Sequence, residues 1–332
     1  MDIKQLKDYG FDFAGYKGMI EGNAEQLAMD SALISTPNTA VPVELTTWMD
    51  NKVIDILTAK RAATEIFGEV KKGNRATPMA KFTAMEQTGY TQPYADYSDN
   101  GVSDINVNYP MRENYLFETI IRYGDVEQEV NALAKLNIAA EKQRSAAHTL
   151  AVDANKFYLK GVAGLQNYGI LNDPSLPAST VASEGAGGSA LWANKTNVEI
   201  YNDILASFGR LSARAAGLVS EVTPLKLVVS PASNVRLGAS SQYNQTVKDL
   251  LKNYFTNLEI VVLPELTSNA GTNMMLVATN VEGQETGECA FSEKMIAGRV
   301  ISELSSFKQK FSAGTFGAVI YRPFLIDVTS GI

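Results

Sequence analysis

The sequence predicts an α+β fold, and three segments of contrasting character support this prediction. Residues 69–112 are rich in turn-forming and β-prone residues, residues 125–160 contain neither glycine nor proline, and residues 197–280 alternate strand-like with helix-like runs. The chain has 332 residues, whereas single hydrophobic cores stop growing at roughly 250–300 residues. We therefore expect more than one sub-domain.

The first segment, residues 1–65, is expected to form an extended N-terminal arm. Much of it mixes glycine, asparagine, serine, threonine and proline with short apolar runs, and such a composition cannot bury itself as an independent unit. One or two short helices are predicted between Trp48 and Phe67, because apolar residues recur there at helical spacing and Gly68 ends the pattern. The arm is too apolar for solvent, so we expect it to lie on a neighbouring copy; the alternative is a frayed terminus.

Residues 66–112 are predicted to form a long, mostly polar β-hairpin. Residues 71–74 indicate a tight bend, and Asn100-Gly101 between two strand-like runs predicts the hairpin turn, since both residue types accept positive φ. Isolated hairpins are only marginally stable in water. A hairpin of this length is therefore expected to rest on another copy of the chain.

The next segment, residues 113–196, is predicted to contain a single long helix at 125–160. Asp125 is the expected N-terminal cap, Gln128 stands three residues later in the capping-box relation, and Gly161 is the expected stop. A helix of about 35 residues spans roughly 50 Å, so this one would serve as a strut.

Residues 197–311 are predicted to form a compact α/β sub-domain. The expected helices are 197–218 and 244–254, and the expected strands are 225–229, 258–263 and 273–278. Residues 312–332 contain a β-prone run, Ala318–Val328, which we expect to form one C-terminal strand tied back into an earlier sheet, because an apolar chain end is poorly suited to fraying.

Charge and composition exclude several classes of function. There are 29 basic against 36 acidic residues, a net charge of −7, and no basic run exceeds Lys71-Lys72, so sequence-specific nucleic-acid binding is not expected. Cys289 is the only cysteine, which excludes an intrachain disulfide and fits a reducing cytoplasm. No stretch approaches the ~18 consecutive apolar residues of a membrane-spanning helix, and the N-terminus lacks a secretory signal, so no membrane partner is expected.

No catalytic, cofactor-binding or metal site is predicted. His148 is the only histidine and lies along the predicted long helix, where a structural role is favoured over a catalytic triad. Cys289 has no basic neighbour in sequence to lower its pKa and is interpreted as a packing residue. The glycines at 161, 164 and 169 follow a helix rather than a strand, and those at 185–188 lack the Gly-Lys-Ser/Thr ending of a phosphate-binding loop.

Several blocks of the sequence resemble the major capsid proteins of tailed bacteriophages and prophages. The most specific is GVAGLQNYGILNDPSLP at 161–177, which follows a predicted helix ending in NKFYLKG. The others are FGEVKKG at 67–73, YADYSDNGVSDINVNYPMRENYLFETI at 94–120, LVVSPA at 227–232 and NLEIVVLPEL at 257–266. The resemblance covers most of the chain from about residue 20 onwards.

This resemblance implies the phage major capsid fold known as the Johnson fold. Its parts would be an N-terminal arm at 1–65, an extended hairpin (E-loop) at 66–112, a peripheral domain at 113–196 with a spine helix at 125–160, an axial domain at 197–311, and a C-terminal strand at 312–332 that returns to the peripheral domain. The implied protein is a non-enzymatic shell subunit that self-assembles into hexamers and pentamers of an icosahedral head enclosing the phage genome.

The resemblance also implies partners and a location. The partners would be copies of the chain itself, portal and scaffolding or decoration proteins, and packaged double-stranded DNA in non-specific contact. The location would be the virion, assembled in the host bacterial cytoplasm. The sequence lacks the long helical N-terminal extension that serves some relatives as a scaffold, so we expect a removed segment or a separate scaffolding protein. No lysine–asparagine crosslink of the kind found in some relatives is assigned.

Three glycines are predicted to act as hinges. Gly68, Gly73 and Gly124 lie at junctions between predicted elements and are predicted hinges for a subunit that must occupy both five-fold and six-fold rings.

Two other functions are alternatives to the phage capsid. One is an encapsulin-like bacterial compartment, which has the same fold but holds cargo enzymes. The other is an α/β enzyme built from residues 197–311, which would need a cluster of titratable residues that the sequence does not reveal.

Overall fold

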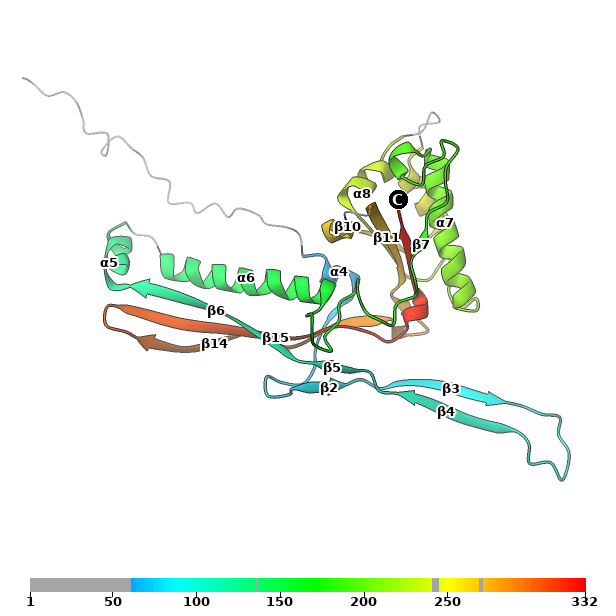
Figure 1. Cartoon of the computed structure of the whole chain (residues 1–332), viewed down its shortest axis with the longest axis horizontal. Coiled ribbons are helices and arrows are strands. Elements are labelled where there is room, and N and C mark those ends of the chain that lie inside the picture. The colour runs from blue at the N-terminus through cyan, green and yellow to red at the C-terminus, as the bar shows by residue number, and fades with distance from the viewer. Residues whose placement is uncertain (1–60, 135–136, 241–244, 269–270) are drawn as a thin grey trace, which may run out of the picture. The chain divides into compact units, whose positions relative to one another are not determined.

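The computed structural model describes residues 61–134, 137–240, 245–268 and 271–332. The fold is a mixture of helices and sheets, as predicted (Figure 1). Nearly all of the predicted arm, including most of the helical stretch from Trp48 to Phe67, lies outside the described residues. Within them, the short helix α4 spans Ala63–Ile66.

A first sheet joins four strands that are far apart in sequence, in the order β1-β14-β15-β6. Their bounds are Glu69–Lys71 for β1, Gly287–Ser302 for β14, Ser306–Ile320 for β15 and Tyr115–Gly124 for β6. Helix α6, Ile138–Lys160, runs along one face of β6 and β15 (Figure 1). The shared core contains Ile121, Tyr123, Ala146, Leu150, Phe311 and Ala313.

A second sheet has the order β7-β16-β11-β8-β9, with β10 added beside β11. The strands are Thr180–Val181 (β7), Ile326–Ser330 (β16), Gly271–Ala278 (β11), Leu225–Val229 (β8), Leu258–Val262 (β9) and Thr267–Ser268 (β10). Its helices are Asn197–Arg214 (α7), Pro231–Leu237 (α8) and Val247–Tyr254 (α9). These elements confirm the strands predicted at 225–229, 258–263 and 273–278 and the two predicted helices.

The central strands β8 and β11 of the second sheet are buried on both faces: alternate residues of a strand point to opposite sides, and here each side lies in a core. Leu227 of β8 and Leu276 of β11 belong to one core, together with Ile204 of α7. Val228 and Met275, their neighbours in sequence, belong to another core. That second core also contains residues of α4 and of the C-terminal end of α6, so it joins the sheet to those helices: Ala63, Ile66, Tyr158 and Leu159.

The predicted hairpin forms, but in two separate ladders. Near its base, β2 (Met79–Lys81) pairs with β5 (Met111–Glu113), and further out β3 (Ala84–Tyr90) pairs with β4 (Val102–Asn108). The predicted two-residue turn at Asn100-Gly101 is wrong. Residues 91–101 form the connecting loop, and Asn100-Gly101 directly precedes β4. The bend predicted at 71–74 is present, with Gly73 at φ +61°.

The predicted single helix at 125–160 is wrong. Helix α5 spans Asp125–Leu133, and α6 begins only at Ile138. Asn137 caps the new helix, since its Oδ1 accepts a hydrogen bond from the Ala140 N–H at 3.3 Å. Asparagine is a strong N-cap because its side chain supplies an acceptor for the N–H groups of the first turn. A new helix can therefore start here without glycine or proline.

The predicted cap at Asp125 is also wrong. Gly124 precedes the first residue of α5, and Asp125 is already helical. The carboxylate of Glu127, rather than the side chain of Gln128, accepts the hydrogen bond from the Gly124 N–H at 3.3 Å. The carboxylate half of the predicted capping box is thus present, one residue earlier than expected.

The predicted C-terminal strand at Ala318–Val328 is divided between the two sheets. β15 ends at Ile320, and a short 3₁₀ turn at Pro323–Leu325 (η3) precedes β16, which pairs with β11 and β7 in the second sheet. Proline has no N–H to donate to a ladder, so it interrupts the run. The predicted segment boundary between residues 311 and 312 falls inside β15, which pairs with β6 on both sides of that boundary.

Short elements complete the described chain. They are the 3₁₀ turns Trp192–Asn194 (η1) and Pro264–Leu266 (η2) and the two-residue strands Asn280–Val281 (β12) and Gln284–Glu285 (β13), which pair with each other.

Candidate assembly surface

The outer ladder of the hairpin exposes large side chains to solvent. Met85 of β3 is 69% exposed, and in the connecting loop Tyr94 is 90% and Tyr97 103% exposed. Val102 and Ile105 of β4 are more than half exposed. Large apolar side chains gathered on one exposed element are typical of an interaction surface.

The two faces of the outer ladder differ in polarity. Cross-strand partners share a face. Met85 therefore lies beside Val107 and Gln87 beside Ile105 on one face, which has no charge; the opposite face pairs Glu86 with Asn106 and Thr88 with Asp104. The uncharged face is suited to an apolar contact, and the acidic face is suited to water or to a basic partner.

The charge of the hairpin is one-sided. Residues 82–111 contain no lysine or arginine, whereas they contain four carboxylates, at Glu86, Asp96, Asp99 and Asp104. Lys81 and Arg112 stand at the two ends of this segment. A basic surface would therefore attract the hairpin electrostatically.

The base of the hairpin, in contrast, is firmly held. Phe82 is buried with Ala290, Phe316 and Val319, and its N–H donates to the Pro110 carbonyl at 2.9 Å. These contacts fix the position at which the outer ladder begins.

A buried ion pair fixes the other strand of the base. The Arg112 guanidinium donates to the Asp173 carboxylate at 2.6 Å, with both side chains buried, and it lies 5.0 Å from the centre of the Tyr168 ring. Asn167 adds two hydrogen bonds from its amide nitrogen, to the carbonyls of Glu113 at 3.1 Å and Thr315 at 3.0 Å. The loop after α6 thus clamps β5 to the first sheet.

A second exposed apolar group lies at the end of the first sheet, where α5 meets the turn between β14 and β15. Val126, Val130 and Leu133 follow one another at helical spacing on α5, and none of them is buried. Leu304 in the turn is 106% exposed, and the Ser305 carbonyl accepts from the Asp125 N–H at 3.1 Å. This end of the sheet therefore presents aliphatic side chains without a partner among the described residues.

The structure shows the surroundings of Cys289, His148 and the glycines after α6, the candidate catalytic or phosphate-binding residues of the sequence. Cys289 is fully buried, and burial raises the pKa of its thiol, so it is not a reactive thiolate. His148 lies exposed on α6. Gly161 and Gly169 sit where a Cβ would approach backbone atoms within 2.2 Å, and Gly161 has φ +63°, which explains these glycines by tight packing between the helix end and the following loop.

Metal and membrane sites are not found in the part of the chain that the structure describes. No group of three histidine, cysteine, aspartate or glutamate residues there could hold a metal ion. Among the same residues, no helix is both long and apolar enough to cross a bilayer.

Sequence reasoning missed the residues that hold the hairpin base. Arg112 and Asp173 are 61 positions apart, and Asn167 is 148 positions from Thr315. No local pattern links such partners. The one available signal was a lone arginine, Arg112, at the end of a strand-like segment free of basic residues.

Comparison with known proteins identifies the fold and the family. A family model described as Pa193 gp26 major capsid protein matches residues 32–331. Among curated proteins no match was found. The capsid of Myoviridae phage XM1 is similar in structure, with a TM-score of 0.70 and 12% identity over 89% of this chain and 100% of that chain.

Two further solved structures share the fold at low identity. Microbacterium phage Oxtober96 matches with a TM-score of 0.59 and 10% identity over 86% of this chain and 96% of that chain. A virus-like particle from Pyrococcus furiosus matches with a TM-score of 0.50 and 13% identity over 81% and 92%. The family and the capsid folds support a structural role rather than an enzymatic one, and nothing in them favours the encapsulin-like alternative.

Proposed function

We propose, because the chain belongs to the Pa193 gp26 major capsid protein family, that copies of it assemble as hexamers and pentamers into an icosahedral head that encloses a phage genome. The main observation behind this proposal is that the outer hairpin ladder exposes its apolar side chains, whereas buried contacts hold its base. Such an element is unsatisfied in one chain and is suited to contact another.

The energetic argument rests on burial. Burying a large apolar side chain contributes about 1.5–3 kcal/mol relative to leaving it exposed. Within the described chain, Met85 and Ile105 gain only part of this, and the loop tyrosines Tyr94 and Tyr97 gain almost none. A neighbouring copy that covers them would recover it, and repeated identical contacts in a closed shell multiply the gain.

The division into parts follows the same proposal. Residues 1–65 act as the arm, 66–112 as the E-loop, 113–196 as the peripheral domain and 197–311 as the axial domain, with 312–332 returning across both sheets. The firm base of the E-loop and the two-sided core of the second sheet support separate mechanical roles for these parts.

Flexibility is needed for one subunit to fit two kinds of ring. Gly68, between α4 and β1, has open space where a side chain would be, which fits a hinge. Gly73 has positive φ, and Gly124 precedes α5. Superposed subunits from pentamers and hexamers should differ at these glycines, and identical backbones there would remove them as hinges.

The proposed partners besides the chain itself are portal and scaffolding or decoration proteins and packaged DNA. The net charge of −7 supports a wall that contacts DNA without specific or strong attraction. Assembly would take place in the host bacterial cytoplasm, and the mature location would be the virion.

Electron microscopy of the purified chain tests the assembly function. The wild type should form hollow particles or hexameric rings. A variant in which residues 84–108 are replaced by a short glycine-containing turn should still unfold cooperatively, because β2, β5 and the Arg112–Asp173 pair remain, yet should form neither particles nor rings. A wild-type chain that stays monomeric at high concentration, with or without a co-expressed scaffolding protein, would contradict the proposal.

A further inference from the structure

The Asn100-Gly101 pair lies in the loop that connects β3 with β4 (Figure 1). Neither residue has the positive φ that the predicted tight turn would require. Both residues are exposed and belong to no helix or strand. Nowhere else in the sequence does a glycine directly follow an asparagine. The pair is thus a feature of the sequence to which the fold of the hairpin gives no role.

The side chain of Asn100 is not held in place. It makes no hydrogen bond within the described chain. The Gly101 N–H donates to no backbone carbonyl there either. Glycine moves between backbone conformations at little steric cost because it has no Cβ. The Gly101 nitrogen can therefore approach Cγ of the Asn100 side chain.

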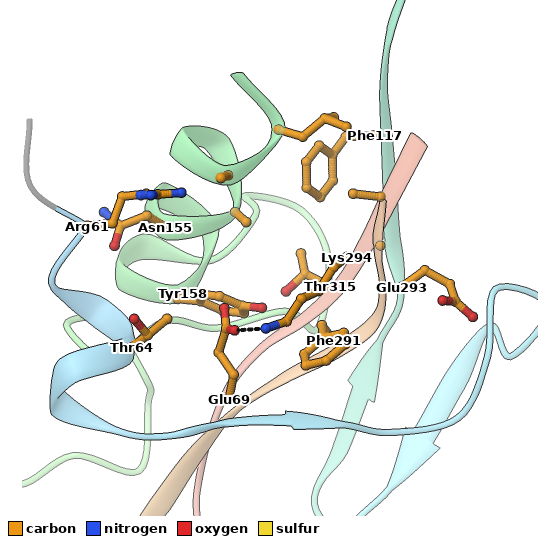
Figure 2. Close-up of a pocket in the computed structure, with 15 residues that line it drawn as sticks. Arg61, Thr64, Glu69, Phe117, Asn155, Tyr158, Phe291, Glu293, Lys294 and Thr315 are labelled. Carbon is orange, nitrogen blue, oxygen red and sulfur yellow. Dashed lines mark ion pairs between the residues drawn. The ribbon is translucent and has the colours of Figure 1, made fainter. Parts of the chain in front are cut away.

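Two buried asparagines show the opposite situation. Asn155 lines a cavity of about 310 Å³, in which Figure 2 shows it near Arg61, and its Oδ1 accepts from the Ala63 N–H at 3.1 Å. Asn167 donates from its amide nitrogen to two backbone carbonyls. Both side chains are more than nine-tenths buried. Packing and hydrogen bonds prevent these amides from turning toward the next peptide nitrogen, and solvent does not reach them.

Asn106 on β4 is a comparison within the same hairpin, because it is exposed as Asn100 is. The residue that follows is Val107, and the ladder pairs Asn106 with Glu86 and Val107 with Met85. Ladder hydrogen bonds and a branched side chain both restrict this stretch of backbone. Asn100 and Asn106 therefore share their exposure and differ in the freedom of the peptide group that follows.

We propose that Asn100-Gly101 is a site of spontaneous deamidation, which makes the hairpin more acidic as the chain ages. The Gly101 nitrogen gives its proton to base and attacks Cγ of Asn100. The new bond closes a five-membered succinimide ring, and Nδ2 takes up a proton and leaves as ammonia. Water then opens the ring at either carbonyl carbon, which yields aspartate or isoaspartate without oxidation or reduction. The ring-closing step is favoured because both reacting atoms belong to one molecule.

The products change both the charge and the backbone of the hairpin. Either one places a new carboxylate beside Asp99, in a segment, residues 82–111, that already has four carboxylates and no basic residue. Isoaspartate also adds a methylene group to the main chain just before β4, where Val102 pairs with Tyr90. These changes occur in a single chain, so the inference does not rest on the proposed function.

Mass spectrometry of the purified full chain tests the site. During incubation in mildly alkaline buffer the chain should gain about 1 Da, because a hydroxyl replaces an amide NH₂. Trypsin cuts after Lys81 and Arg112 and leaves Asn100 and Asn106 in one peptide, since no lysine or arginine lies between. Fragment ions should place the gain at Asn100, partly as isoaspartate. No gain at Asn100, or an equal gain at Asn106, would overturn the inference.

A substitution at residue 101 tests the role of the glycine. Gly101→Ala should slow the gain at Asn100 about tenfold, equivalent to about 1.4 kcal/mol of activation free energy, because a Cβ restricts the approach of the nitrogen. The new Cβ would lie 3.8 Å from the Tyr90 carbonyl oxygen, an ordinary contact, so the fold accommodates it. The control Asn100→Gln should show no gain at residue 100, since its ring would need six members. An unchanged rate in Gly101→Ala would contradict the mechanism.

Unfolding gives a readout of the loop itself. Because the folded loop leaves Asn100 free, its rate of deamidation should be similar in the folded chain and in guanidinium chloride. The rate at Asn106 should rise on unfolding, since the ladder no longer restricts Val107. A rate at Asn100 that also rises several-fold would show that the folded loop protects this residue, and it would overturn the inference.

Discussion

The strand pairs β8–β11 and β3–β4 have the same antiparallel ladder but opposite surroundings. Residues of β8 and β11 alternate between two cores, so both faces of that pair are buried. On β3 and β4 nearly every side chain is exposed. The pair β8–β11 is stabilised by burial within one chain. The pair β3–β4 has side chains whose burial would stabilise it, but no part of the described chain covers most of them. The comparison distinguishes residues that stabilise the fold of one chain from residues that are available for contacts between copies.

The largest predicted effect lies where the two regions meet, at the base of the hairpin. Arg112→Met leaves the Asp173 carboxylate buried without its cation, and breaking a buried pair costs about 3–5 kcal/mol. Urea unfolding of the unassembled chain should show this loss. In the exposed Lys71–Glu293 pair, Lys71→Met should cost at most about 1 kcal/mol, and equal losses in the two variants would contradict the assigned role of the buried pair.

The next effect measures the buried strand pair directly. Leu276 of β11 is fully buried, so Leu276→Ala should lower the free energy of unfolding by about 2–5 kcal/mol. Ile105→Ala on the outer hairpin, where the side chain is exposed, should change it by no more than about 0.5 kcal/mol. A large loss for Ile105→Ala in the monomer would show that the hairpin is packed within its own chain.

The same contrast explains which elements the sequence could predict. The strands β8, β9 and β11 were predictable because both of their faces are buried or half-buried, which produces short continuous apolar runs. The hairpin was predictable in outline from its turn-rich, alternating composition. Its turn was not, because the polar loop 91–101 contains several turn signals and Asn100-Gly101 was only one of them.

The errors have identifiable physical causes. The break before α6 depends on one side chain, Asn137, whose capping role is visible only once the helix is built. The division of the C-terminal run between two sheets depends on Pro323 and on pairing partners many residues away. The cavity lined by Arg61, Phe117, Tyr158, Phe291 and Thr315 joins five parts of the sequence, and no motif marks it.

A smaller effect concerns acid sensitivity at the start of α7. The backbone N–H groups of Ala186 and Thr196 donate to the Glu199 carboxylate, at 2.6 and 2.7 Å, and lower its pKa below the usual 4.5. A lowered pKa in the folded state contributes stability above pH 4.5 that is lost as the pH falls through the folded value. Glu199→Gln should therefore flatten the acid limb of the stability–pH curve.

The control for this prediction is Glu184→Gln, at a nearby carboxylate that makes no hydrogen bond in the described chain. Urea unfolding at a series of pH values from neutral to strongly acidic gives the curves. If the acid limb of Glu199→Gln has the wild-type slope, the carboxylate does not stabilise the helix start through its charge.

The smallest effect on folding should accompany a large effect on assembly. Met85→Ser with Ile105→Ser removes apolar surface from the uncharged face of the outer ladder, where both side chains are exposed. The free energy of unfolding of the monomer should change by no more than about 0.5 kcal/mol. The matched control, Val222→Ser with Val235→Ser, removes equally exposed side chains from loops and helices of the second sheet. Only the variant with Met85→Ser and Ile105→Ser should fail to form particles in electron micrographs, because burial of the hairpin between copies stabilises the particle. Loss of particles in both, or in neither, would mean that exposure alone does not distinguish the contact surface from the rest of the molecule.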